Sequence, residues 1–166
     1  MKLVFLACVF AVFCALGYII WRKFKIRKVF FENVLSFCEH MLVEISFSQN
    51  TIRNIIEMYS SGYAKHFKLL LTEYMELIDK KTDITRERIT TIIDQTLLKP
   101  NETNVLVDFF TELGRHGAKE EKQKIENKKI AFCEIYKTCS EALKRDASIY
   151  LKLFIFLGVG AVIICI

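Results

Sequence analysis

Apolar residues gather in two long runs, one near each end of the 166-residue sequence. Leu3 to Trp21 holds 19 residues without a charge, and Leu153 to Ile166 holds 14 more. An α-helix rises about 1.5 Å per residue, so about 20 apolar residues cross the hydrocarbon core of a bilayer. The first run meets that length, and the second reaches 18 residues if Lys152 extends its ammonium group to the interface. The pattern predicts transmembrane helices at residues 1–21 and 149–166.

The first run also shares features with a secretory signal peptide, because Lys2 precedes it and small residues occur within it. No small-x-small cleavage site followed by a polar stretch is present. The run ends in Tyr18 and Trp21, and basic residues follow at once. We therefore expect an uncleaved anchor rather than a cleaved signal peptide.

Between the two runs, apolar residues recur at spacings of three and four, which is typical of helices that bury one face. Clear examples are Phe30, Val34, Phe37, Met41 and Ile45. One proline and three glycines in this stretch favour long helices with few joints. We predict helices over residues 29–45, 51–59, 63–80, 84–98, 101–113 and from 118 onward, the first and last running on from the apolar runs.

Polar and conformationally special residues separate these helices. Ser48 to Asn50 offers caps for the second helix, and Asp83 offers a cap for the fourth. Pro100 is expected to stop the fourth helix, Asn101 to cap the fifth, and Gly114 to end it. The predicted fold class is therefore all-α: a cytoplasmic bundle of about six helices at residues 22–148, flanked by an N-terminal and a C-terminal transmembrane helix.

Basic residues fix the expected orientation of the two spans. Five of them directly follow the first span: Arg22, Lys23, Lys25, Arg27 and Lys28. Lys144, Arg145 and Lys152 flank the second span on the same side. Cytoplasmic loops carry an excess of Lys and Arg, so both termini are expected to point outward and the bundle to face the cytoplasm. The cluster is also expected to contact anionic lipid headgroups.

The net charge of +5 comes from these membrane flanks. Without Lys2, Lys152 and the cluster of five, 17 basic residues face 19 acidic ones. A mildly acidic bundle argues against nucleic acid as a partner. Three of the six cysteines, Cys8, Cys14 and Cys165, lie in the spans, and no C-x-x-C motif occurs. We expect neither a disulfide framework nor a zinc site.

The sequence lacks the common catalytic signatures. It contains no Walker phosphate loop, no G-x-S-x-G and no H-E-x-x-H motif. The three histidines lie on separate predicted elements, and His40 with Glu44 on one helix face is expected to be a surface contact. We therefore expect a protein that is not an enzyme, with no cofactor, no metal and no small-molecule substrate. The charged stretch from Lys119 to Lys129 fits either a solvated helix face or a docking surface for a partner.

Two short segments, together with both spans, resemble a known family. The first is Phe109-Phe110-Thr111-Glu112-Leu113-Gly114-Arg115-His116, followed by a polar helix with Gln123; the second is Glu44-Ile45-Ser46-Phe47-Ser48-Gln49-Asn50-Thr51-Ile52. Their order and the whole-chain layout are similar to the stage III sporulation protein AB family. The sequence departs from the family pattern at Gly117, where an acidic residue is usual, and at Thr51, where proline is common.

The resemblance implies a role in spore formation. It implies a membrane platform in the export-like complex that joins mother cell and forespore during engulfment, located in the mother-cell membrane. It also implies a likeness to the platform protein of type II secretion and type IV pilus machines. A cytoplasmic secretion-type ATPase and other membrane proteins of the complex would then be its partners. Our candidate docking residues for the ATPase lie between Arg115 and Lys124: Arg115, Lys119, Glu120, Gln123 and Lys124.

Two other hypotheses remain open on the sequence alone. The chain is alternatively a generic two-span membrane adaptor or regulator whose cytoplasmic helical domain binds some other protein. The third possibility is an enzyme with a site that no motif reveals. A pocket with converging carboxylates or histidines would favour the enzyme.

Overall fold

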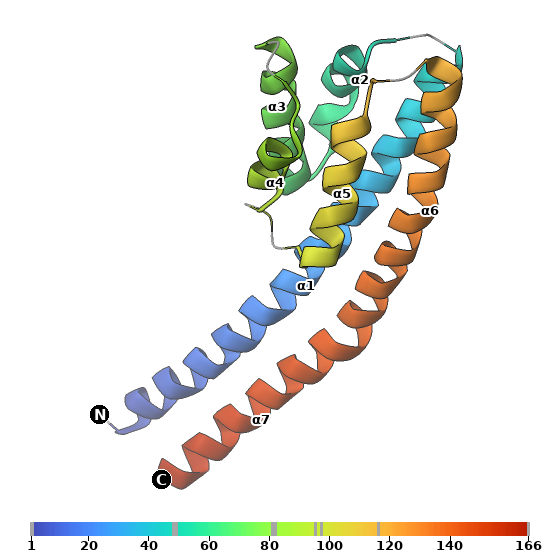
Figure 1. Ribbon diagram of the computed structural model, residues 1–166. Coiled ribbons are helices and arrows are strands. Elements are labelled where there is room, and N and C mark those ends of the chain that lie inside the picture. The colour runs from blue at the N-terminus through green and yellow to red at the C-terminus, as the bar shows by residue number, and fades with distance from the viewer. Residues whose placement is uncertain are drawn as a thin grey trace. The chain divides into compact units, whose positions relative to one another are not determined.

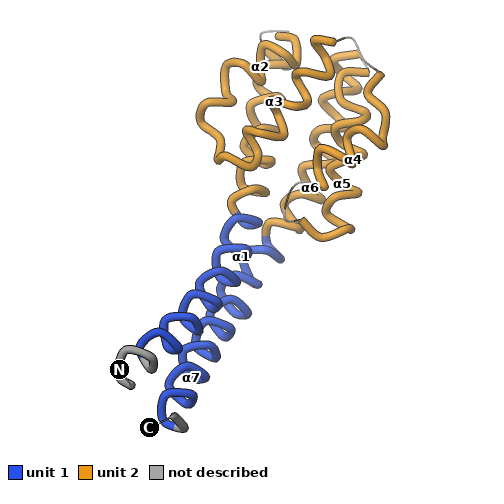
Figure 2. The backbone as a smooth tube through the Cα atoms, turned by 90° about the vertical axis from the view of Figure 1, so that its left-hand side faces the viewer, with its two compact units in different colours: residues 1–28, 137–166 blue, residues 29–136 orange. Residues whose placement is uncertain are grey.

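The computed structural model describes residues 2–47, 50–80, 83–94, 96, 98–115 and 117–165. Throughout these ranges the regular structure is helical, which confirms the predicted all-α class. The elements are α1 (Lys2–Phe47), α2 (Ile52–Tyr59), the 3₁₀ helix η1 (Ser60–Gly62), α3 (Lys65–Asp79), α4 (Arg86–Asp94), α5 (Pro100–Glu112), α6 (Ala118–Ala142), the π-helical segment η2 (Leu143–Ala147) and α7 (Ser148–Cys165) (Figure 1). They form two compact units, residues 29–136 and residues 1–28 with 137–166 (Figure 2).

Phe37 of α1 stands at the centre of the larger unit, with no exposed surface. Its ring centroid lies 5.8 Å from that of Phe67 on α3 and 6.4 Å from that of Phe110 on α5. Phe109 on α5 also packs against Phe132 on α6, at 5.3 Å. We call this set the aromatic core: Phe30, Phe31, Phe37, Phe67, Tyr74, Phe109, Phe110 and Phe132. The apolar stripes predicted on separate helices therefore meet in one place.

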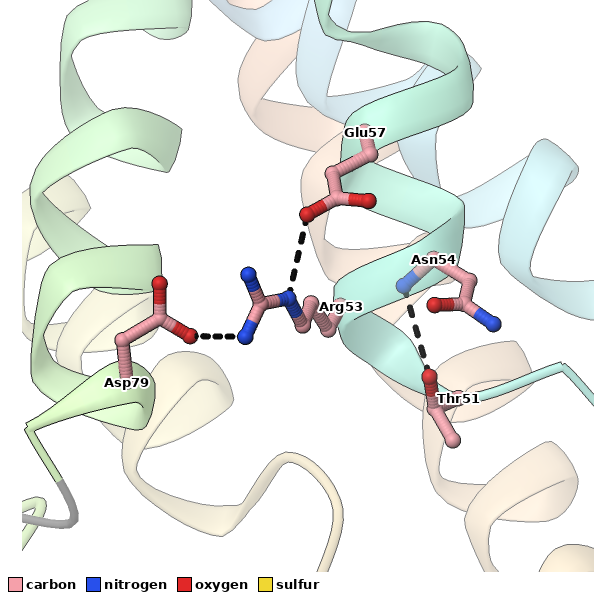
Figure 3. A network of polar contacts seen from close by, with 5 residues as sticks. All are labelled: Thr51, Arg53, Asn54, Glu57 and Asp79. Atoms are coloured by element: carbon pink, nitrogen blue, oxygen red, sulfur yellow. Dashed lines mark hydrogen bonds and ion pairs between the residues drawn. The ribbon is translucent and has the colours of Figure 1, made fainter.

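The short helix α2 begins as predicted, but its cap differs from the expected one. Thr51 is the N-cap, and its hydroxyl accepts a hydrogen bond from the amide of Asn54 at 3.4 Å (Figure 3). Asn50 instead donates its side-chain amide to Glu44. Ser48 and Gln49, the other expected caps, lie outside the described residues.

The fourth helix is shorter than the predicted 84–98, because α4 covers only Arg86–Asp94. The amide and the hydroxyl of Thr96 both donate to the Ile93 carbonyl, which closes the chain into a turn. Asp83 does not occupy the cap position, since α4 begins three residues after it, and its backbone carbonyl accepts from the amide of Thr85 instead. Lys81, Thr82 and Leu97 lie outside the described residues.

The start of α5 also corrects the prediction. Pro100 occupies the first turn of α5, where its missing N–H costs nothing. Lys99 is the N-cap residue, and the buried carboxylate of Glu102 accepts its backbone N–H at 3.1 Å. Asn101, the expected cap, lies inside the first turn instead.

Gly114 ends α5 as expected, with a φ of +80°. Only glycine adopts this left-handed conformation without cost. A Cβ at this position would also lie 2.5 Å from Cδ1 of Ile52. The chain therefore reverses here and α6 begins at Ala118, as predicted.

The smaller unit consists of the two apolar ends of the chain, packed against each other. A Cβ at Gly17 would lie 3.1 Å from Cβ of Phe154, and one at Gly158 would lie 3.0 Å from the ring of Phe10. Gly17 comes later in α1 than Phe10, whereas its neighbour Phe154 comes earlier in α7 than Gly158. The two segments are therefore antiparallel. Small residues at such crossings let helix backbones approach closely.

Two described helices are long and apolar enough to cross a membrane, one within Ala7–Phe47 and the other within Ala118–Ile163. The first is unbroken from Lys2 to Phe47, and α6 passes through η2 into α7 without a loop. Both predicted continuations are thus confirmed. The exact division into residues 1–21, 22–148 and 149–166 stays a prediction.

Truncation of the central aromatic residue tests the core. We expect Phe37→Ala to lower the free energy of unfolding by about 3–5 kcal/mol, because it leaves a cavity among rings on three helices. Phe47→Ala, on the same helix but at an 84% exposed position, is the matched control and should change stability little. Urea unfolding of the full chain in detergent micelles, followed by circular dichroism, measures both. Equal losses for the two variants would contradict this account of the core.

A second pair of variants tests the α5–α6 turn. Gly114→Ala is expected to cost about 1–2 kcal/mol, since alanine must adopt a left-handed conformation. Gly117→Ala is the control, because a Cβ there meets nothing within 4 Å and the residue has no positive φ. The same unfolding measurement compares them, and a harmless Gly114→Ala would show that the turn does not need glycine.

Candidate docking site

The predicted docking residues lie around the corner between α5 and α6. Lys119, Glu120 and Gln123 are exposed on the first two turns of α6. Lys124 is half-buried, with its Nζ 3.7 Å from Oε2 of Glu112 on α5. We call the set Arg115, Lys119, Glu120, Gln123 and Lys124 the polar edge. The structure brings these five residues to one corner of the larger unit.

Arg115 forms a hydrogen bond that stabilises this corner. Its Nη2 donates to the backbone carbonyl of Ile84 at 2.8 Å, which ties the corner to the segment before α4. Arg86, which lies two residues after Ile84, forms an ion pair with Asp108 that joins α4 to α5. His116, which belongs to the family-like segment, lies outside the described residues.

Glu121 is the residue that the sequence analysis missed. It lies within the charged stretch, yet only 6% of its surface is exposed. Its Oε1 accepts the backbone N–H of Gly114 at 2.9 Å, which satisfies an amide just past the end of α5. The available signal was its position one turn before Ile125, on the same buried stripe of α6. The expected solvated face is therefore interrupted by a buried carboxylate.

The second oxygen of Glu121 is buried, and among the described residues nothing donates a hydrogen bond to it. The hydroxyl of Tyr74 on α3 is in the same condition. Burial raises the pKa of Tyr74, the negative charge of Glu121 raises it further, and Arg115 opposes them. Glu121 and Arg115 thus both lie close enough to Tyr74 to affect its pKa.

A cleft of about 520 Å³ opens beside Glu121. Its lining residues come from the end of α1, the start of α2 and the α5–α6 corner: Ile45, Asn50, Thr51, Ile52, Gly114, Ala118 and Glu121. The two segments that carry the family resemblance, residues 44–52 and 109–116, therefore meet at this cleft. We call it the Glu121 cleft.

The prediction that His40 and Glu44 form a surface contact is wrong, because only 9% of the Glu44 surface is exposed. Its carboxylate accepts from the Tyr59 hydroxyl at 2.8 Å and from the Asn50 amide at 2.7 Å. The His40 ring stacks on Tyr59 with centroids 3.9 Å apart. The hydrogen bond to Glu44 raises the pKa of Tyr59. These contacts join α1 to α2, so the group has a structural role.

Polar contacts also fasten the other side of α2. Arg53 pairs with Glu57 one turn along the helix and with Asp79 at the end of α3 (Figure 3). Both pairs are half exposed, so each contributes little to stability. Within the described ranges no group of three His, Cys, Asp or Glu side chains is placed to hold a metal ion.

The basic cluster after the first apolar run lies on α1. Arg22, Lys23 and Lys25 are exposed, Lys28 is half-buried and Arg27 is 8% exposed. Lys25 also lies over the Trp21 ring, with its Nζ 5.2 Å from the ring centroid. Because successive helical residues are turned by about 100°, the five positions surround the helix rather than forming one stripe.

A known protein family matches almost the whole sequence. No curated protein and no solved structure shows a significant match to the sequence. The family described as Stage III sporulation protein AB matches residues 2–166, which cover both apolar ends, the bundle, the polar edge and the Glu121 cleft. The chain therefore belongs to the stage III sporulation protein AB family.

Proposed function

We propose that this chain is a membrane platform of a sporulation-specific, secretion-like complex between mother cell and forespore. In this proposal two membrane spans hold the helical bundle on the cytoplasmic face of the mother-cell membrane around the forespore. The bundle docks a cytoplasmic secretion-type ATPase. Membership of a stage III sporulation family and two helices long enough to span a bilayer support the proposal.

The continuity of the helices is the observation that carries this proposal. α1 holds both a candidate span and the buried stripe with Phe37, within 46 uninterrupted residues. α6 holds the polar edge and continues through η2 into the second candidate span. Because no flexible loop intervenes in either case, a force applied to the bundle passes along hydrogen-bonded helix. This suits a platform that transmits ATP-driven motion to membrane components.

The polar edge supplies chemistry for docking. It presents exposed charges of both signs on the first turns of α6, with Lys119 and Glu120 adjacent. Charged groups at an interface favour the correct partner and accelerate its association more than they add affinity. An ATPase surface with complementary charges would dock here in one orientation. The basic cluster from Arg22 to Lys28 would lie at the level of anionic lipid headgroups.

Deletion of the gene tests the proposed role in spore formation. We expect heat-resistant spores to fall by orders of magnitude and development to stop around the end of engulfment. The full chain should restore the spore count, whereas residues 22–148 alone should not, because they lack both candidate spans. Normal spore yield, in a strain without a second copy of the gene, would sink the platform proposal. Rescue by residues 22–148 would show that membrane attachment is unnecessary.

A charge reversal tests the polar edge. Lys119→Glu is expected to weaken binding of the secretion-type ATPase to the full chain in nanodiscs by about 10-fold, through like-charge contacts at the interface. Lys68→Glu makes the same change at an exposed position of α3 and serves as the control. Surface plasmon resonance at two salt concentrations measures both. Binding of the ATPase that is equally strong for both variants would mean that the polar edge is not its docking surface.

A further inference from the structure

The Glu121 cleft differs chemically from the polar edge. Two isoleucines and an alanine, Ile45, Ile52 and Ala118, provide apolar walls, and one buried carboxylate lies among them. A volume of about 520 Å³ falls within the range of ordinary ligand pockets and exceeds the needs of a single water molecule. The cleft is therefore large enough for side chains of a bound segment.

The two oxygens of Glu121 have different surroundings. Oε1 is fixed by the amide of Gly114, so the carboxylate is held in one orientation. Oε2 has no donor within the part of the chain that the structure describes, although the side chain is nine-tenths buried. A buried carboxylate oxygen without a donor costs free energy, and a donor that arrives with a partner recovers it.

Two basic residues of the polar edge make contacts elsewhere, and the Tyr74 hydroxyl does not donate to Glu121. The Arg115 guanidinium donates to the Ile84 carbonyl, and the Lys124 ammonium lies beside Glu112. A metal ion is a poor occupant, because Glu121 supplies the only carboxylate among the described residues that line the cleft. A cationic hydrogen-bond donor from another molecule fits both the negative charge and the apolar walls.

We infer that the Glu121 cleft receives an arginine side chain of a partner protein, whose guanidinium pairs with the Glu121 carboxylate while its aliphatic stem packs against Ile45 and Ile52. Arginine suits this place better than lysine, because a guanidinium is less strongly hydrated and its planar fork matches a carboxylate. Hydrogen bonds between charged groups are also the stronger ones. This inference rests on the proposed docking function and adds a second, chemically defined contact to it.

The test uses the full chain in detergent micelles and two synthetic peptides. The first is acetyl-Leu-Arg-Leu-amide, and the second replaces arginine with citrulline, a neutral residue of nearly the same shape. The amide signal of Gly114 in NMR spectra reports binding, because that amide is bonded to Glu121. We expect the arginine peptide to shift this signal saturably and to bind about 10-fold or more tightly than the citrulline peptide.

Three variants separate the cleft from general charge effects. Glu121→Gln keeps an oxygen for the Gly114 amide but loses the charge, and should weaken the arginine peptide by about 10-fold. Glu126→Gln removes the same charge from an exposed position of α6 and should change nothing. Ala118→Leu leaves Glu121 intact and narrows the cleft, and should also weaken the peptide. This third variant decides the matter if Glu121→Gln destabilises the fold.

The outcomes distinguish this inference from the docking proposal. If the ATPase binds and Lys119→Glu weakens it, while neither peptide shifts the Gly114 signal, the arginine inference fails and docking at the polar edge stands. If the peptide binds as expected and the ATPase does not bind at all, the ATPase proposal fails and the cleft still selects arginine. Equal binding of the arginine and citrulline peptides overturns the inference in either case.

Discussion

Burial of Phe37 is the constraint on which the larger unit depends. This ring is fully buried because α3 and α5 each place an aromatic side chain against it, Phe67 and Phe110. Protein interiors are packed as densely as organic crystals, so the three helices must hold fixed positions around it. α6 joins the same core through Phe132, which packs against Phe31 and Phe109. The corner between α5 and α6, and with it the polar edge, is therefore positioned by aromatic packing together with the hydrogen bonds of Arg115 and Glu121.

Three buried carboxylates accept hydrogen bonds at turns and helix ends of this unit. Glu44 accepts from Tyr59 and Asn50 at the α1–α2 connection, and Glu102 accepts the Lys99 amide at the start of α5. Glu121 accepts the Gly114 amide beyond the end of α5. Each satisfies a donor at a turn or a helix end, where the regular ladder of backbone hydrogen bonds stops. Glu121 differs from the usual arrangement because its second oxygen is buried without a donor among the described residues, which is why we consider it a site as well as a structural group.

The sequence predicted most of this fold because most of its helices carry one apolar stripe at helical spacing. Phe30, Val34, Phe37 and Met41, which their spacing placed on one buried face, are all buried. The caps were less predictable, since Asn50, Thr51 and the neighbouring polar residues are all suitable, and only the final geometry selects Thr51. The end of α4 depends on two hydrogen bonds from Thr96, which no periodicity reveals. The cleft was beyond prediction, because it forms only where residues 45–52 meet residues 114–121, two segments far apart in the sequence.

The arrangement of α6 links the polar edge and the Glu121 cleft. Successive residues turn by about 100°, so Lys119 and Gln123 share one face while Glu121 and Ile125 share another, nearly opposite, face. The first pair is exposed and the second pair is buried. A partner that contacts both faces must therefore pass around the N-terminal end of α6, over Ala118, which lines the cleft. Such a partner would hold the end of a helix that continues, through η2, into a candidate membrane span. A partner bound at that end is suited to pushing α6 along its own axis. The α-helical hydrogen bonds lie nearly parallel to that axis, so they carry an axial load directly.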